Sequence, residues 1–227
     1  MKRQIRILIT SILFLVLNIS VNAQDLYNSL SIELCECLES RKIKNASEMD
    51  SCIDDLFINN SNLIKEYYKV TDLSEINFDE LFAKVGAKII KQCEYVIENF
   101  PLGTVGSDKK IDKQIDLDCE DKLIGDYYYF TKRPDSAILD TTFVNISNDK
   151  FLEKMNFSNT YSLLRIIWKD NCKFDLEFQE SDDLIKKEVS KPGDIYHYEV
   201  IAKLKNSVFL KLFWNNREYQ LELIKKE

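Results

Sequence analysis

The spacing of apolar residues changes once along this chain, and that change limits the fold more than any other feature. Between residues 24 and 100 apolar side chains recur with a helical period, as in Leu26, Leu30, Leu34 and Leu38. From residue 117 onward they alternate with polar residues, as in Phe174, Leu176 and Phe178. The two periods predict an α+β chain in which a helical bundle precedes an antiparallel sheet.

The helical half divides at short polar segments. The pattern predicts helices over 26–41 and 45–57, a break at "INNSN", a short helix over 63–68 and a long helix over 78–100, with Asn77 as one of two candidate caps. The polar segment 101–116 then contains two of the five glycines and is interpreted as a linker. The predicted domains are therefore a helical domain over 24–100 and a strand domain over 117–227.

The second half contains about eight alternating segments separated by turn signals such as "NNR". We expect strands near 126–131, 137–145, 150–157, 161–168, 173–180, 195–205, 207–214 and 217–224. The insertion "SDDLIKKEVSKPGD" lies between the fifth and sixth segments and can hold a helical turn. Eight short strands in sequence favour a closed eight-stranded barrel, with a two-sheet β-sandwich as the alternative.

The first 23 residues have the pattern of a secretory signal peptide. A basic start is followed by an apolar run, Ile7–Leu17, and by the cleavage sequence Val21–Ala23. Export to the periplasm or the medium is therefore expected, with an uncleaved anchor as the alternative. Removing the three basic charges of this segment changes the net charge from −7 to −10. Such an acidic protein is not suited to bind nucleic acid, and no further membrane span is expected.

Six cysteines in an exported chain predict three disulfides. Cys35, Cys37, Cys52 and Cys93 precede the linker, whereas Cys119 and Cys172 follow it. An even number on each side predicts two separately cross-linked units. The second unit then has one choice, Cys119–Cys172, which would contribute about 4 kcal/mol in the chain-entropy model.

Helix geometry limits the pairing of the first four cysteines. Residues two apart on a helix point about 200° apart, so Cys35 and Cys37 reach different neighbours. Cys35 and Cys52 lie at equal distances from the turn between the first two helices. Cys37 follows the leucine stripe and faces the core. We therefore predict Cys35–Cys52 and Cys37–Cys93, and the exchanged pairing remains open.

No residue pattern indicates catalysis, a metal or a cofactor. Zinc sites use cysteines two to four apart or cysteine with histidine, and redox pairs use C-x-x-C. The chain's single histidine, His197, lies in the other half on a predicted strand, where a structural role is the simpler interpretation. Glycine-rich phosphate loops and common hydrolase motifs do not occur. These observations leave open whether the chain is an enzyme, and they favour a non-enzymatic protein.

Aromatic residues are the best candidates for binding. In an eight-stranded barrel they either fill the core or line a small apolar pocket. The candidate ligand-binding residues are Tyr127, Tyr129, Trp168, Tyr198 and Trp214. Core filling is the alternative role for each of them.

Several segments look familiar as a set: "DCEDKLIGDYYY", "RIIWKDNCKFDLEF", "KPGDIYHYEVIAKL" and "YQLELIKKE". The Cys-to-Gly-to-aromatic segment and the W-x-x-x-C hairpin resemble those of small exported lipocalin-like proteins of Bacteroidetes. The matching residues are Cys119, Gly125, Tyr127, Trp168 and Cys172. Gly125-x-Tyr127 is also similar to the lipocalin G-x-W opening, with Tyr in place of Trp. The resemblance covers about half of the chain and implies an exported lipocalin-like barrel, without transferring a catalytic residue.

Three functions follow as hypotheses. The first is an exported, non-enzymatic binding protein that holds a small apolar ligand in the barrel. The second is a periplasmic protein-interaction, inhibitor or immunity protein whose acidic surface meets a basic protein partner. The third is a hydrolase whose catalytic residues are adjacent only in the folded chain.

Overall fold

The structure is a computed structural model that describes residues 25–100, 111–112, 117–118, 123–132, 139–155, 159–169 and 172–226. The predicted signal peptide, most of the predicted linker, and Cys119 lie outside these residues. The chain divides into two compact units, and the boundary lies between Tyr95 and Val96. Residues 44–46 are grouped with the second unit. The two units are described separately, and the predicted domain bounds stay predictions.

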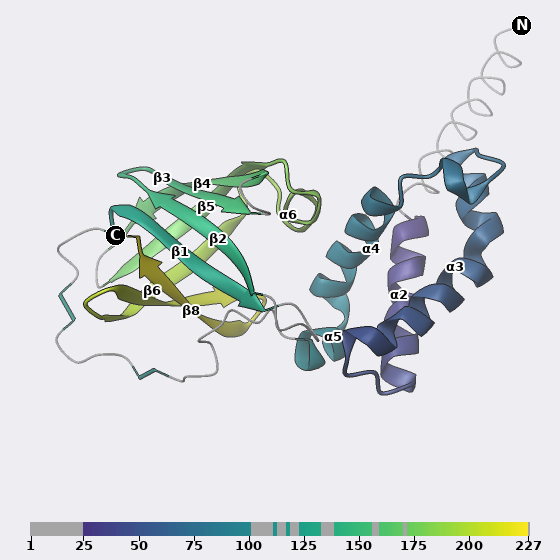
Figure 1. Cartoon of the computed structure of the whole chain (residues 1–227), viewed down its shortest axis with the longest axis horizontal. Helices are drawn as coiled ribbons and strands as arrows, with labels where there is room; N and C mark the ends of the chain where they lie inside the picture. The colour runs from purple at the N-terminus through teal and green to yellow at the C-terminus, as the bar shows by residue number, and fades with distance from the viewer. Residues whose placement is uncertain are drawn as a thin grey trace, which may run out of the picture. The chain divides into compact units, whose positions relative to one another are not determined.

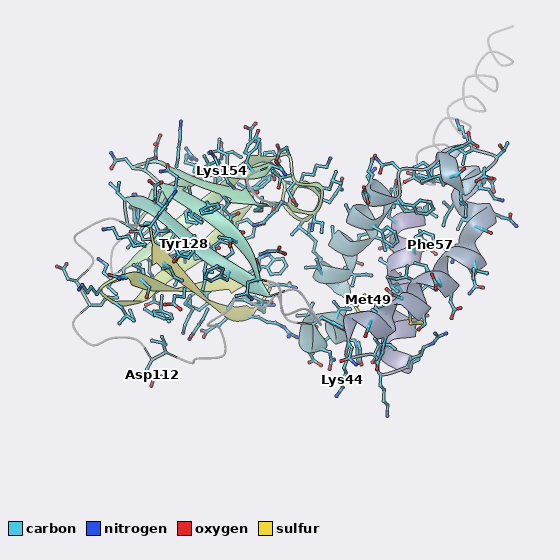
Figure 2. All side chains as sticks on the ribbon, viewed as in Figure 1. Lys44, Met49, Phe57, Asp112, Tyr128 and Lys154 are labelled. Carbon is cyan, nitrogen blue, oxygen red and sulfur yellow. A yellow bond between two sulfur atoms is a disulfide. The ribbon has the colours of Figure 1, made fainter. Side chains whose placement is uncertain are left out.

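The first unit is helical. It contains α2 (Asp25–Ser40), α3 (Ala46–Tyr68), a short 3-10 helix η1 (Leu73–Glu75), α4 (Phe78–Gln92) and the start of α5 (Glu94–Asn99). The leucine stripe of α2 is buried, with Leu30 and Leu38 fully inaccessible. Leu81, Val85 and Ile89 of α4 are buried as well. Phe57 of α3, labelled in Figure 2, contacts the rings of Phe78 and Phe82, with centroids 5.4 and 5.1 Å away.

Two helix bounds differ from the prediction. The expected break at "INNSN" is absent, and α3 continues through it. Asn60 shows why: its side-chain amide donates to the carbonyl of Leu56 in the same helix at 2.9 Å and to Glu33 of α2 at 2.8 Å, so its polar group is satisfied in a helical conformation. The predicted long helix instead ends at Gln92, where Cys93 has an extended conformation and its N–H bonds to Ile89. Asn77 caps α4 by accepting from the N–H of Glu80, as the sequence predicts.

The disulfides of the helical unit are the exchanged pairs. Cys35 bonds to Cys93 and Cys37 to Cys52, each with Cα atoms 5.8 Å apart, so the predicted pairs Cys35–Cys52 and Cys37–Cys93 are wrong. The prediction paired Cys37 with Cys93 because Cys37 follows the buried leucine stripe of α2. In fact α3 lies along the side of α2 that bears Glu33, as its contact with Asn60 shows. Cys37 is one turn further on the same side.

The distance argument could not separate the two pairings. Cys35 and Cys37 are two residues apart, so their positions along the helix axis differ by only about 3 Å. A different side-chain conformation and a small shift of the helix can make up that distance. The direction of each cysteine therefore decides: Cys37 points to α3, and Cys35 points to the end of α4.

The second unit is a closed antiparallel barrel. In its described residues the eight strands are β1 (Gly125–Lys132), β2 (Leu139–Ile146), β3 (Lys150–Met155), β4 (Thr160–Trp168), β5 (Lys173–Ser181), β6 (Ile195–Lys203), β7 (Ser207–Trp214) and β8 (Arg217–Lys225). Each strand pairs with the next, and β8 returns to β1 (Figure 1). The barrel prediction is confirmed, and the sandwich is excluded.

The barrel closes through a short seam. β1 and β8 pair at Tyr127↔Lys225 and Tyr128↔Ile224, and the N–H of Lys226 donates to the carbonyl of Asp126 at 2.9 Å. β7 and β8 are joined by Asn215 and Asn216, both with positive φ, as a tight hairpin turn requires. These pairings leave the sheet without a long open edge.

The insertion between β5 and β6 forms a small helix, α6 (Leu184–Val189), as the sequence predicts. Figure 1 shows it beside one end of the barrel. Asp183 caps α6 by accepting from the N–H groups of Ile185 and Lys186. The connection is also tied to β5, because Phe178 exchanges backbone hydrogen bonds with Gly193 and Asp194.

Candidate functional site

The barrel interior is filled over most of its length and hollow at one end. Its filled part contains buried side chains from all eight strands, among them Val144, Ile146, Phe151, Leu164, Ile166, Phe174, Leu176, Val200, Leu210 and Leu223. Close packing of this kind is normal for a small barrel. The hollow end is where β1, β3, β5 and β7 finish and β2, β4, β6 and β8 begin.

A cavity of about 350 Å³ occupies this end. It is lined by Tyr129, Thr131, Asp140, Thr141, Thr142, Glu153, Met155, Asp183, Lys186, Tyr198, Leu212, Trp214, Tyr219, Gln220 and Leu221. Four of these side chains are aromatic and three are aliphatic or thioether. The cavity is at the small end of the range for ligand sites, and apolar walls with a few placed polar groups are typical of such sites.

Glu153 is the buried charge of the cavity, with 9% of its side chain exposed. The hydroxyl of Tyr129 donates to Glu153 Oε1 at 2.8 Å. Lys186 Nζ donates to Glu153 Oε2 at 2.8 Å. Both carboxylate oxygens therefore have a donor, as a buried charge requires.

The two donors come from different parts of the barrel. Tyr129 is an inward residue of β1, whereas Lys186 enters from α6, outside the strand wall. The Lys186 side chain as a whole is 39% exposed, but burial desolvates its ammonium next to Glu153. The position of α6 thus decides whether Glu153 has its counter-charge.

The charges of this group follow from burial and from Glu153. Burial raises the pKa of the Tyr129 hydroxyl well above its usual value, and the charge of Glu153 raises it further. Burial likewise raises the pKa of Tyr198. For Lys186, burial lowers the pKa, but the charge and hydrogen bond of Glu153, together with Tyr198 and Tyr196, outweigh this and the net shift is upward. Near neutral pH the tyrosines are hydrogen-bond donors and Lys186 is a cation.

Three of the five predicted ligand residues line the cavity: Tyr129, Tyr198 and Trp214. Tyr127 belongs to the filled part and is 5% exposed. Trp168 lies towards the opposite end, where its indole N–H donates to the carbonyl of Asn148 in the β2–β3 turn at 2.9 Å. Its ring is 5.3 Å from that of Phe174. Tyr127 and Trp168 therefore pack with the core, and Tyr127 also lines a second hollow on the outer face of the barrel.

The charged pair was not predicted from the sequence. For Glu153 a signal exists, because it lies between Phe151 and Met155 at the inward positions of β3. A charged residue at an inward strand position is unusual unless it is paired. For Lys186 no comparable signal exists, because its role depends on how α6 folds back over the barrel.

His197 lies outside this cavity. It is on the outer face of β6, 59% of its side chain is exposed, and its Nδ1 is 2.8 Å from Asp175 Oδ1. Lys169 also pairs with Asp175. These contacts hold the imidazole on the outer face of the barrel beside Asp175. The buried hydroxyl of Ser190 bonds instead to Tyr196, the neighbour of His197 that faces the other way.

A second hollow of about 370 Å³ lies on the outer face of β1, β2 and β3. Phe143, Lys154 and Lys226 line it, and the ammonium of Lys226 is 5.6 Å from the centre of the Phe143 ring. Lys154 projects outward from the barrel (Figure 2). Both hollows are open to solvent to a similar degree, but the outer one lacks a buried charge such as Glu153.

Disulfides join the described cysteines. Cys172 is also disulfide-bonded, and its predicted partner Cys119 lies outside the described residues.

In the described chain no three His, Cys, Asp or Glu side chains are grouped as metal ligands would be. None of the helices in the described ranges has both the length and the apolar character needed to cross a bilayer.

Comparisons of the chain with protein-family models, curated proteins and solved structures find no significant match. The resemblance to exported lipocalin-like proteins therefore stays an expectation from the sequence motifs.

Proposed function

We propose that this chain is an exported binding protein that holds a small ligand in the hollow end of its barrel. The observation that carries the proposal is the 350 Å³ cavity, lined by Tyr129, Tyr198 and Trp214, in a barrel whose remaining interior is filled. A barrel with a purely structural role would gain stability by filling this space.

The walls indicate a ligand with an apolar body. Met155, Leu212 and Leu221 supply aliphatic and thioether surface, and the aromatic rings supply flat faces. Burying apolar ligand surface against these residues is the main source of affinity. The resemblance to lipocalin-like proteins supports the same function.

Export is supported by the N-terminal pattern and by the disulfides. Disulfides form and persist in oxidising compartments and are rare in the cytosol. Sequencing the N-terminus of the protein isolated from its own host tests this directly. A mature chain that begins at Gln24 supports export, and an uncleaved Met1 in the cytoplasmic fraction contradicts it.

Binding is tested by native mass spectrometry of the protein purified from its own host, with two matched variants. Leu212→Trp fills the cavity, whereas Leu204→Trp adds the same group at an exposed position, 59% accessible, at the opposite end of the barrel. We expect wild type and Leu204→Trp to release a small molecule that Leu212→Trp has lost. If no variant carries a small molecule, but a second polypeptide co-purifies with all three, the protein-partner hypothesis replaces this one.

A further inference from the structure

The cavity already accommodates a cation at a defined place. Lys186 is an ammonium on a flexible four-carbon chain, and it reaches Glu153 from outside the strand wall. Its side chain is 39% exposed, whereas that of Glu153 is 9% exposed. The carboxylate belongs to strand β3, and the ammonium reaches it from α6 at the end of a flexible chain.

The remaining surroundings favour positive charge over negative charge. Among the described lining residues, Asp140, Glu153 and Asp183 are acidic, and Lys186 alone is basic. Asp183 uses one carboxylate oxygen to cap α6, but its charge remains close to the cavity. A ligand anion that approached Lys186 would also approach Glu153, and like charges in a partly buried site repel strongly.

The aromatic lining is suited to a cation as well. Tyr129, Tyr198, Trp214 and Tyr219 contribute ring surface, and Trp214 and Tyr219 lie 6.2 Å apart at 48°. Ring faces attract ammonium groups, with Trp the most effective, and the attraction grows when water is excluded. The same rings contact an apolar body.

We infer that the ligand is a small amphipathic amine, whose apolar body lies against the aromatic and aliphatic walls and whose ammonium pairs with Glu153 in place of Lys186. This inference rests on the proposed binding function and specifies the ligand's charge. Displacement of Lys186 returns its ammonium to water, and the ligand ammonium takes over the pairing with Glu153 that Lys186 gives up.

Three probes with one skeleton test the charge: 2-phenylethylamine, 2-phenylethanol and 3-phenylpropionate. Binding to the full-length mature protein is measured by calorimetry, and its location by the fluorescence of Trp214 in a Trp168→Phe background. We expect the amine to bind about tenfold more tightly than the alcohol, since a charge-assisted hydrogen bond replaces a neutral one. We expect the carboxylate to bind most weakly.

Two variants move the amine's affinity in opposite directions. Glu153→Gln keeps the shape and removes the charge, so the amine should bind no better than the alcohol. Lys186→Met removes the competing ammonium, so the amine should bind about tenfold more tightly than to wild type. Lys187→Met is the matched control, because Lys187 is exposed and outside the lining, and it should leave all three affinities unchanged.

The outcomes separate the two proposals. Binding of alcohol or carboxylate at least as tightly as the amine, with loss of binding in Leu212→Trp, overturns the amine inference and keeps the binding function. Binding of none of the three to wild type overturns the amine inference, and the binding function is then decided by whether wild type releases a small molecule in native mass spectrometry. A loss of amine affinity in both Glu153→Gln and Lys186→Met shows that the pair only maintains the barrel, and it overturns the inference as well.

Discussion

The helical unit and the barrel are stabilised in different ways. Among the described residues of the helical unit, no backbone hydrogen bonds join one helix to the next. Association therefore depends on side chains: the leucine stripe of α2, the buried face of α4, polar contacts such as Asn60–Glu33, and two disulfides. In the barrel, every strand is hydrogen-bonded on both sides around a closed ring. The ring keeps its backbone bonds even where side chains do not fill the interior. A cavity is therefore tolerated in the barrel, and side-chain packing is indispensable between the helices.

The largest effect is expected from removing a cross-link. The Cys35–Cys93 disulfide spans 58 residues, and Cys35→Ala with Cys93→Ala should cost about 4 kcal/mol. Both tryptophans, Trp168 and Trp214, lie in the barrel. Urea unfolding should therefore show a lower midpoint by circular dichroism at 222 nm and an unchanged midpoint by fluorescence. Equal movement of the two midpoints would contradict separate stabilisation of the units.

Within the barrel, the filled part should be much more sensitive than the hollow end. Leu210 is fully buried in the filled part, and Leu210→Ala should cost about 3 kcal/mol. Leu212, two residues further on the same face of β7, lines the cavity, so Leu212→Ala should cost about 1 kcal/mol. Fluorescence-detected urea unfolding of both variants measures the difference. Equal costs would mean that the cavity is filled by side chains in solution.

Separating the buried charges should have an intermediate effect. Lys186→Met leaves Glu153 without its counter-ion and should cost about 1–2 kcal/mol, less than for a fully buried pair because Lys186 is partly exposed. Adding Glu153→Gln should restore part of the loss. A double-mutant cycle on the fluorescence midpoint measures the coupling, and additive costs would show that the pair has none.

Alkaline pH should weaken the barrel through its tyrosines. The pKa values of Tyr129 and Tyr198 are raised by burial, so the neutral forms are favoured in the folded state. Their stabilising contribution is fully present below the tyrosine pKa of the unfolded chain, about 10, and is lost as pH rises above it. Between about pH 9 and pH 11 the free energy of unfolding should fall by about 1.4 kcal/mol for each of these two tyrosines. Tyr129→Phe should reduce this slope, and an unaltered slope would exclude Tyr129 as its source.

The smallest effect is expected on the barrel's outer face. His197 pairs with Asp175, but it is 59% exposed, and Asp175 keeps Lys169 as a second partner. His197→Ala should therefore change the fluorescence midpoint by no more than about 0.5 kcal/mol. A larger loss would show that the outer face contributes more to the barrel than its exposure indicates.

Strand positions could be predicted because each inward residue is two positions from the next, so the pattern of Phe174, Leu176 and Phe178 determines both the strand and its face. Helix ends were less predictable. Asn59 and Asn60 look like a break, but a contact with Glu33 of another helix satisfies Asn60. The disulfide pairing failed for the same reason, because a helical stripe shows which side of α2 is buried but not which helix covers each part of it.

The candidate site shows the same limit. Tyr129, Tyr198 and Trp214 could be found because inward aromatic residues are visible in the alternation. The same alternation cannot tell the filled part from the hollow end, so Tyr127 and Trp168 were included with them. The contact of Lys186 with Glu153 depends on a fold-back across 33 residues, which no local pattern encodes.

Both disulfides of the helical unit begin on α2, and this gives the unit an unusual tolerance of chain cleavage. A protease cut between α2 and α3 leaves α2 attached to α4 through Cys35–Cys93, and α3 remains continuous with η1 and α4. A cut between α3 and α4 leaves both helices attached to α2, one through each disulfide. After either cut the three helices remain one covalent body, whose fragments separate on a gel only after reduction.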